Sequence, residues 1–277
     1  MIRALATSLF SALLCLAAST PAPGDPVLRA GFVPVSPAAQ LAARFTPLLD
    51  LLSAKTGQQF DFVTAPGFPV FMERTARGEY DLIWVPPHFA RQASLETGYE
   101  PLAAGGKKVV GVFLARRDGP GAARNIRNKT LALVDPLALV SILVLSHLED
   151  EGLRADRDYR VRYFQSHPSA IEAVRRGVAD LAGVSDVHVE QELTAGRADL
   201  VEIARTMEAP GLVFLAHPRV PEPTRRLIRS ALLSMGESPE GKSALDRAKT
   251  GSLVPISASD LKKMDKILQK MKSSPGR

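Results

Sequence analysis

The chain has 277 residues, 45% of them hydrophobic, with a formal net charge of +6. This length is sufficient for two lobes, and the hydrophobic content is typical of a globular protein. The positive excess is mild, no aromatic cluster alternates with the basic residues, and no nucleic-acid-binding motif occurs. We therefore expect no nucleic-acid partner.

The first 23 residues have the pattern of a cleavable signal peptide. Arg3 precedes an apolar run from Ala4 to Ala18, and small residues and prolines follow. The run is shorter than the roughly 20 residues that cross a bilayer, so we expect a soluble protein exported to the periplasm. Cys15 follows the bulky Leu14, which fits a lipoprotein cleavage site poorly, so we expect no lipid anchor.

Cleavage near residue 24 would change the chemistry available to the mature protein. It removes one basic residue, which lowers the net charge to +5, and it removes the only cysteine. A chain without cysteine excludes disulfides, zinc–thiolate sites and thiol nucleophiles.

From residue 27 onward, short β-type runs alternate with helical patterns, which is typical of an α/β fold with mostly parallel sheets. Helices are predicted where apolar residues recur at three- and four-residue spacing, often with a glycine such as Gly57 after the last turn. The first part of the chain predicts strands at 27–33, 59–64, 80–85, 99–103 and 108–115, and helices at 37–56, 68–77 and 88–97.

The second part repeats this alternation and then changes. It predicts strands at 130–134, 159–164, 180–184, 200–205 and 212–216, and helices at 137–151, 168–176, 186–194, 222–235, 239–248 and 259–271. The last three helices have no strands of their own to cover, so we expect them to pack on the first lobe.

This packing requires the chain to cross between two lobes twice, and we assign the first crossing to the continuous apolar run at 109–114. The predicted architecture is a two-lobed α/β protein with two hinge crossings. Lobe 1 comprises 24–113 plus 212–277, and lobe 2 comprises 114–211.

Ligands of such proteins bind beyond the carboxyl ends of the strands, where the chain enters the next helix. The free N–H groups of a first helical turn suit anions or other acceptors. Serines at these positions also have a simpler role, which is to cap their own helices, and His88 is as readily structural or exposed. The candidate ligand-binding residues at these turns and helix starts are Ser36, Phe68, His88, Phe89, Leu137, Ala138, Leu139, Ser141, His167, Ser185 and Asp186.

Motifs that carry enzyme chemistry are absent from the sequence. It contains no G-x-S-x-G, no H-E-x-x-H, no P-loop and no G-x-G-x-x-G in a suitable setting. We therefore expect no catalytic residues, no metal site and no cofactor.

Several stretches resemble the phosphate/phosphonate-type substrate-binding proteins of ABC transporters, which are periplasmic binding proteins of type 2. The resemblance implies a small-molecule ligand held between two lobes, an ABC permease as partner, and a monomer. The matching stretches are Gly31-Phe32-Val33-Pro34, 45–52, Thr56-Gly57, 77–82, Pro87-His88-Phe89-Ala90, 131–136 and 167–180.

The resemblance also shows where this chain departs from the family. In phosphonate binders a Ser/Thr-rich helix start follows the Asp-Pro turn, whereas this chain has Leu137, Ala138 and Leu139, with the first hydroxyl at Ser141. Each lost hydrogen bond to a charged oxygen costs roughly 1.5–3 kcal/mol. Phe89 stands where the family often has tyrosine. We therefore expect a ligand that is less anionic or more apolar than a phosphonate.

Other features fit the family. His167 matches its cleft histidine, and Ser185 and Asp186 lie where its members reach the ligand from the following strand. Two alternatives remain at this point. A sensory module of the same fold would present its liganded state to a membrane receptor or histidine kinase, and an exported enzyme is the weakest alternative.

Overall fold

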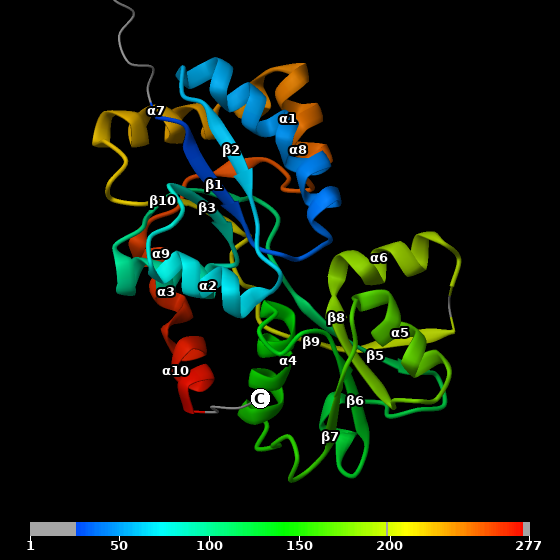
Figure 1. Cartoon of the computed structure of the whole chain (residues 1–277). Helices are drawn as coiled ribbons and strands as arrows, with labels where there is room; N and C mark the ends of the chain where they lie inside the picture. Colours follow the sequence, from blue (N-terminus) through cyan, green and yellow to red (C-terminus); the bar gives the residue numbers. More distant parts are fainter. Residues whose placement is uncertain (1–25, 198, 274–277) are drawn as a thin grey trace, which may run out of the picture.

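The computed structural model describes residues 26–197 and 199–273, so the predicted signal peptide and Cys15 lie outside the described residues. The chain forms two β-sheets, each flanked by helices, and we call the parts around them the first and the second lobe (Figure 1). In the described part of the chain, no helix combines the length and apolar character needed to span a membrane.

The first lobe is built on a six-stranded sheet with the order β11-β4-β10-β3-β1-β2. One apolar cluster joins its face to α1, α7 and α8, and a second joins the opposite face to α2 and α3. The strands are β1 (Leu28–Phe32), β2 (Phe60–Val63), β3 (Leu82–Val85), β4 (Glu100–Gly105), β10 (Val213–Ala216) and β11 (Leu253–Val254), and the helices are α1 (Ala38–Thr56), α2 (Phe68–Ala76), α3 (Pro87–Thr97), α7 (Glu222–Leu233) and α8 (Pro239–Ala248).

The second lobe is built on a five-stranded sheet with the order β7-β6-β8-β5-β9. Separate apolar clusters fill the two faces of this sheet, one beneath α4 and one beneath α5. The strands are β5 (Gly111–Arg116), β6 (Thr130–Leu133), β7 (Arg160–Tyr163), β8 (Leu181–Ser185) and β9 (Leu200–Arg205), and the helices are α4 (Leu139–Asp150), α5 (His167–Arg175), α6 (Asp186–Thr194) and a short 3-10 helix, Ala123–Ile126.

The predicted α/β fold with two sheets flanked by helices is confirmed, and both sheets are mixed: most strands of each sheet run in one direction, and a few run against it. Strands joined through helices are parallel: β1 with β2 and β3, and β6 with β7 and β8. Strands on either side of the lobe crossings are antiparallel to their neighbours: β10 to β3 and β4, and β5 to β8 and β9. β5 is the first strand after the chain enters the second lobe, and β10 is the first strand after it returns to the first lobe. Each runs opposite to both of its neighbours in the sheet.

The chain passes between the sheets at 106–110 and again at 206–212. These two segments lie side by side, with Val109 and Ala209 in an isolated β-bridge and the Gly105 N–H donating to the Leu212 carbonyl at 2.8 Å. A Cβ atom at Gly211 would lie 2.3 Å from the Gly105 carbonyl oxygen, so only glycine allows this approach.

The first crossing therefore differs from its predicted position. Val112 and Phe113 already pair within the second sheet, so the crossing precedes the predicted boundary at residue 113. The apolar run from 109 to 114 reflects a central strand buried on both faces, not a crossing.

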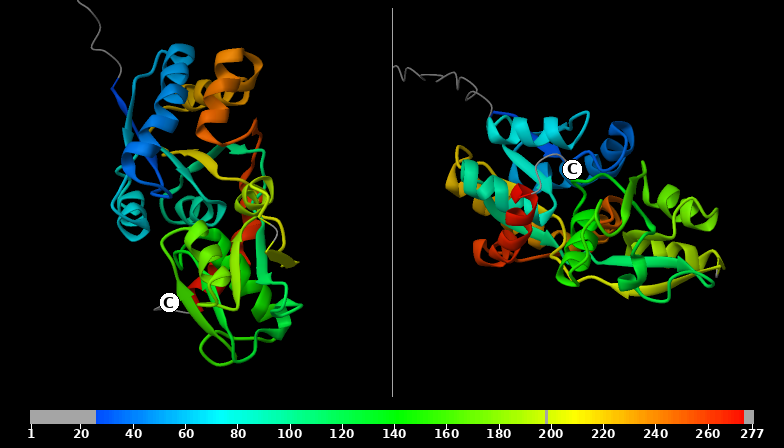
Figure 2. Two further views of the ribbon diagram at one scale, coloured as in Figure 1. Left: turned by 90° about the vertical axis from the view of Figure 1, so that its right-hand side faces the viewer. Right: turned by 90° about the horizontal axis from the view of Figure 1, so that it is seen from below.

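The C-terminal helices also depart in part from prediction. As expected, α7 and α8 pack on α1 of the first lobe, and the short α9 (Ala258–Leu261) packs on α3. However, α10 (Asp265–Ser273) contacts both α3 of the first lobe and α4 of the second. Figure 2 shows this helix, in red, beside the green α4 from two further sides.

Both polar and apolar contacts hold α10 in this position. Asp265 pairs with Arg91 of α3 at 2.7 Å, and Lys266 pairs with Asp150 of α4 at 3.1 Å. Between the helices lies an apolar cluster, which comprises Leu139, Ile142, Leu143, Ala209, Met264 and Ile267.

We expect Ile267→Ala to destabilise the protein, because Ile267 is only 2% exposed at this junction. Loss of its buried side chain should lower the free energy of unfolding by about 2–4 kcal/mol, measured by urea denaturation. Gln269→Ala, at an exposed position of the same helix, is the matched control and should change it by less than about 0.5 kcal/mol. Equal effects of the two substitutions would show that α10 does not dock as described.

Candidate functional site

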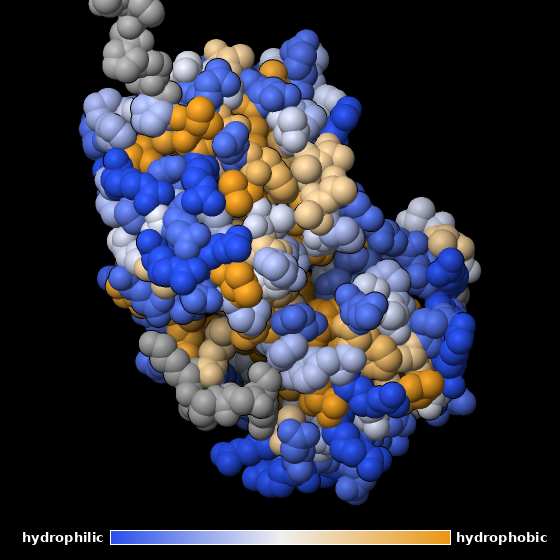
Figure 3. All heavy atoms as spheres, viewed as in Figure 1, coloured by the Kyte–Doolittle hydropathy of each residue, from blue (hydrophilic) through white to orange (hydrophobic). Residues whose placement is uncertain are grey.

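Helix starts from both lobes meet where the lobes face each other. In the first lobe, α2 follows β2 and α3 follows β3; in the second, α4, α5 and α6 follow β6, β7 and β8. Figure 3 shows the surface hollowed between the upper lobe and the part of the lower lobe that carries α6. The N–H groups of a first helical turn have no partner within the helix, so such ends favour polar or anionic ligand atoms.

His88 forms a direct contact between the lobes. Its imidazole is fully buried at the start of α3, and Nε2 lies 3.2 Å from the carbonyl oxygen of Leu137 in the second lobe. The ring packs on Phe89 at a centroid distance of 4.2 Å, and Phe89 lies 5.8 Å from Phe68. Leu137 packs against the same apolar cluster. The structure therefore brings together four of the predicted residues.

The turn before α4 uses much of its own hydrogen-bonding capacity. The N–H of Leu137 donates to Oδ1 of Asp135 at 2.8 Å, and the N–H of Ala138 donates to the Asp135 carbonyl at 2.9 Å. Ala138 occupies the N-cap position and provides no side-chain cap. The amides of the turn itself thus donate to Asp135 and are not free for a ligand.

Ser141 and Leu139 serve the interior and not an open site. The Ser141 side chain is fully buried, and its hydroxyl donates to the Val134 carbonyl at 3.2 Å. Leu139 belongs to the apolar cluster with α10. The first hydroxyl after the Asp-Pro turn, that of Ser141, is therefore engaged in a hydrogen bond within the protein and does not face a ligand site.

A second group of predicted residues surrounds the starts of α5 and α6. The rings of His167 and His188 lie 4.4 Å apart, and the Ser185 hydroxyl lies 2.8 Å from Nδ1 of His188. Ser185 does not cap α6, whereas Ser166 does cap α5 through a capping box with Ser169.

The remaining two candidates, Asp186 and Ser36, make no contact that links the two lobes among the contacts described. Asp186 accepts a hydrogen bond from the N–H of Val187 at 2.9 Å. Ser36 is half-buried and makes no cap for α1, whose N-cap is Pro37. The charge of Asp186 acts on His188 of the second group and partly offsets the lowering of its pKa by burial and by Lys249.

Sequence reasoning missed two residues near this second group. His188 is not among the predicted site residues, although its position three residues after Ser185 at a helix start places both on one side of the first turn. Lys249, from the end of α8 in the first lobe, lies close enough for its charge to lower the pKa of His188, after burial as the larger cause. No sequence signal connects Lys249 to this site, because the lobes bring it there.

Both histidines that carry the predicted site are held neutral. Burial lowers the pKa of His88 to about 4, and the hydrogen bond to Leu137 offsets only part of this effect. Burial also lowers the pKa of His167 to about 3, and the neighbouring His188 adds to it. Neither imidazole therefore offers a positive charge to an anion at neutral pH.

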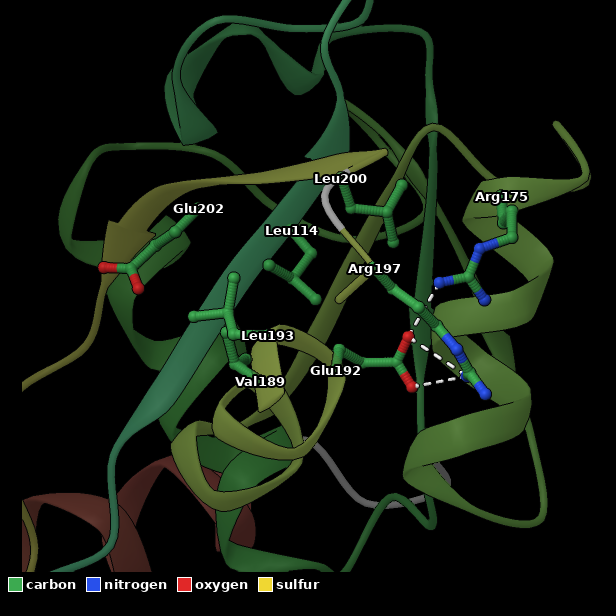
Figure 4. A pocket seen from close by; sticks show the side chains of 8 residues that line it. All are labelled: Leu114, Arg175, Val189, Glu192, Leu193, Arg197, Leu200 and Glu202. Carbon is green, nitrogen blue, oxygen red and sulfur yellow. Dashed lines mark hydrogen bonds and ion pairs between the residues drawn. The ribbon is translucent and has the colours of Figure 1, made fainter. Parts of the chain in front are cut away.

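The pocket in Figure 4 lies elsewhere, within the second lobe between α5, α6 and β9. Its charged side chains neutralise one another: Glu192 lies 2.7 Å from Arg175 and 3.0 Å from Arg197. With its charges paired, this pocket offers little to a polar ligand. Among the described residues, no three metal-ligating side chains form a group that would hold an ion.

We expect the free energy of unfolding to fall as the pH drops from 6.5 toward 5. The two histidines stay neutral in the folded protein but take up protons when unfolded, so acid favours the unfolded state by roughly 1 kcal/mol per pH unit for each. Urea denaturation at several pH values, above the range where carboxylates titrate, measures this slope. His88→Gln should make it shallower, and an unchanged slope would contradict the assignment.

Comparisons with known proteins agree with this architecture. The protein XAC2383 of Xanthomonas citri, bound to ATP, is 19% identical, with a TM-score of 0.78 over 89% of this chain and 98% of that one. PhnD1 of Prochlorococcus marinus, in complex with methylphosphonate, is 17% identical, with a TM-score of 0.77 over 90% and 99%. The aliphatic sulphonate binding protein SsuA of Escherichia coli is 17% identical, with a TM-score of 0.63 over 90% and 94%.

These likenesses show the two-lobed fold of periplasmic binding proteins. A family model that covers residues 30–261 goes further, because it spans most of the chain and describes substrate-binding proteins and not enzymes. The chain belongs to the family of periplasmic phosphonate substrate-binding proteins of ABC transporters.

Proposed function

We propose that this protein captures a small solute between its lobes in the periplasm and delivers it, as a monomer, to an ABC permease. We further propose that the solute is less anionic or more apolar than a phosphonate. Family membership supports the first part and favours transport over a sensory role. The described starts of α3, α4, α5 and α6, which lie where the lobes face each other, support a site at that place.

One observation carries the second part. The side chain of Leu137, just before α4, packs against the apolar cluster that includes Phe68 and Phe89, at a turn where the phosphonate binders it resembles have hydroxyl groups. The next hydroxyl, that of Ser141, is already bonded to Val134. An anionic head group would therefore meet apolar side chains and neutral imidazoles, which replace its hydration poorly.

The fold alone leaves the ligand open. Proteins of similar fold were solved with ATP and with methylphosphonate, and another is named for aliphatic sulphonates. The ligand is consequently set by side chains at the helix starts and not by the arrangement of sheets.

A thermal-shift and native mass spectrometry screen of the exported protein against a solute library tests this function. A solute at about 100 times its dissociation constant adds roughly 2.7 kcal/mol of stability, a visible shift in melting. We expect at least one neutral or weakly charged solute to bind one-to-one. Submicromolar binding of alkylphosphonates or phosphite in isothermal titration would contradict the proposed ligand class, and a screen without any binder would contradict the function.

Restoring hydroxyls to the turn tests the physical reason. We expect the double substitution Leu137→Ser and Ala138→Ser to tighten methylphosphonate binding at least about tenfold, because hydroxyl donors to charged oxygens contribute roughly 1.5–3 kcal/mol each. Leu193→Ser, at a leucine of α6 that is 62% exposed, is the matched control and should have no effect. An unchanged affinity in a double variant with a normal melting temperature would contradict the role assigned to the missing hydroxyls.

A further inference from the structure

The two ring nitrogens of His88 have different surroundings. Nε2 lies 3.2 Å from the Leu137 carbonyl oxygen. Nδ1 is buried and has no hydrogen-bond partner among the described residues. A buried polar atom without a partner is costly and uncommon in native proteins, so Nδ1 calls for an explanation.

The contact at Nε2 determines the chemistry of Nδ1. A carbonyl oxygen only accepts hydrogen bonds, so Nε2 must carry the proton. In a neutral imidazole the other nitrogen then has a free lone pair and acts as an acceptor. Burial, which lowers the pKa of His88 to about 4, keeps the ring in this neutral form. The sequence identifies His88 only as a candidate ligand-binding residue, and the geometry makes its free nitrogen an acceptor.

The position of the ring connects this acceptor to the solute site. His88 stands at the start of α3, and its partner Leu137 precedes α4 in the other lobe, so the ring lies at the boundary between the lobes. Phe89 and Phe68 supply apolar surface beside it. A second buried imidazole nitrogen without a partner among the described residues, Nδ1 of His167, stands at the start of α5 in the second lobe.

From these contacts, and resting on the proposed function, we propose that Nδ1 of His88 accepts a hydrogen bond from an O–H or N–H group of the bound solute. The site then selects an uncharged solute whose polar head carries a donor over a solute of the same shape that is fully deprotonated. A head group without a donor would place its own lone pairs next to the lone pair of Nδ1, and the repulsion between them would weaken binding. His88 is thus a specificity-determining residue of the interlobe site.

Methanesulfonamide and methanesulfonate are matched probes for this proposal. Both have a methyl group on a tetrahedral sulfur, but the first carries an NH₂ donor and the second a charged oxygen. We expect isothermal titration to show at least about fivefold tighter binding of methanesulfonamide. Equal affinities, or tighter binding of methanesulfonate, would overturn the proposal.

Two substitutions separate the roles of the ring nitrogens. His88→Asn keeps an amide group near the position of Nδ1, and its oxygen can still accept, so the preference for methanesulfonamide should persist. His88→Gln places its amide near the position of Nε2, where it can donate to Leu137, but leaves no acceptor at Nδ1, so the preference should disappear. A preference retained by His88→Gln would overturn the proposal.

Long-range ¹H–¹⁵N spectra of the unmodified protein with labelled histidine provide a readout that needs no variant. We expect the Nε2–H tautomer for His88 and a change in its Nδ1 resonance when methanesulfonamide is added. A proton on Nδ1 would overturn the proposal even if library solutes bind. Failure of the whole library to bind would instead count against the proposed function, so the two failures are distinguishable.

Discussion

The start of α4 is fixed against the first lobe from two sides, and the rest of the site depends on this contact. On one side the Leu137 carbonyl accepts from His88, and the Leu137 side chain packs against the apolar cluster of the first lobe that includes Phe68 and Phe89. On the other side Leu139 packs against α10. Since both contacts are apolar or neutral, the turn that would meet a ligand's head group has become part of the packing between lobes.

This packing also explains the electrostatics of the site. A charged imidazole at His88 would lose its hydration without gaining a counter-ion, so burial keeps it neutral. His167 behaves similarly in the second lobe. The proposed interlobe site therefore offers a ligand neutral imidazole nitrogens and helix N–H groups, and charge has a smaller part in it than in a site built on arginines.

The helix α10 adds a third connection to the two chain crossings. Its ion pairs reach the largely buried Arg91 in one lobe and Asp150 in the other. The exposed Lys266–Asp150 pair contributes little energy by itself. The buried Met264 and Ile267 carry more of the attachment. Hinge motion in this protein must therefore keep α10 seated on α4 or break an apolar contact, which distinguishes it from a clamshell joined only by its crossings.

The sequence by itself determined the α/β class, the alternation of strands and helices, the two crossings and the turns that hold His88, Leu137 and His167. These depend on local patterns: apolar periodicity, and glycine or proline at element ends.

Tertiary structure alone decided that the sheets are mixed, that α10 contacts both lobes, and that Lys249 approaches His188. It also decided that Ser141 faces Val134 and that the free nitrogen of His88 accepts. Each of these depends on residues distant in sequence, whose meeting is set by packing between elements that no local pattern encodes.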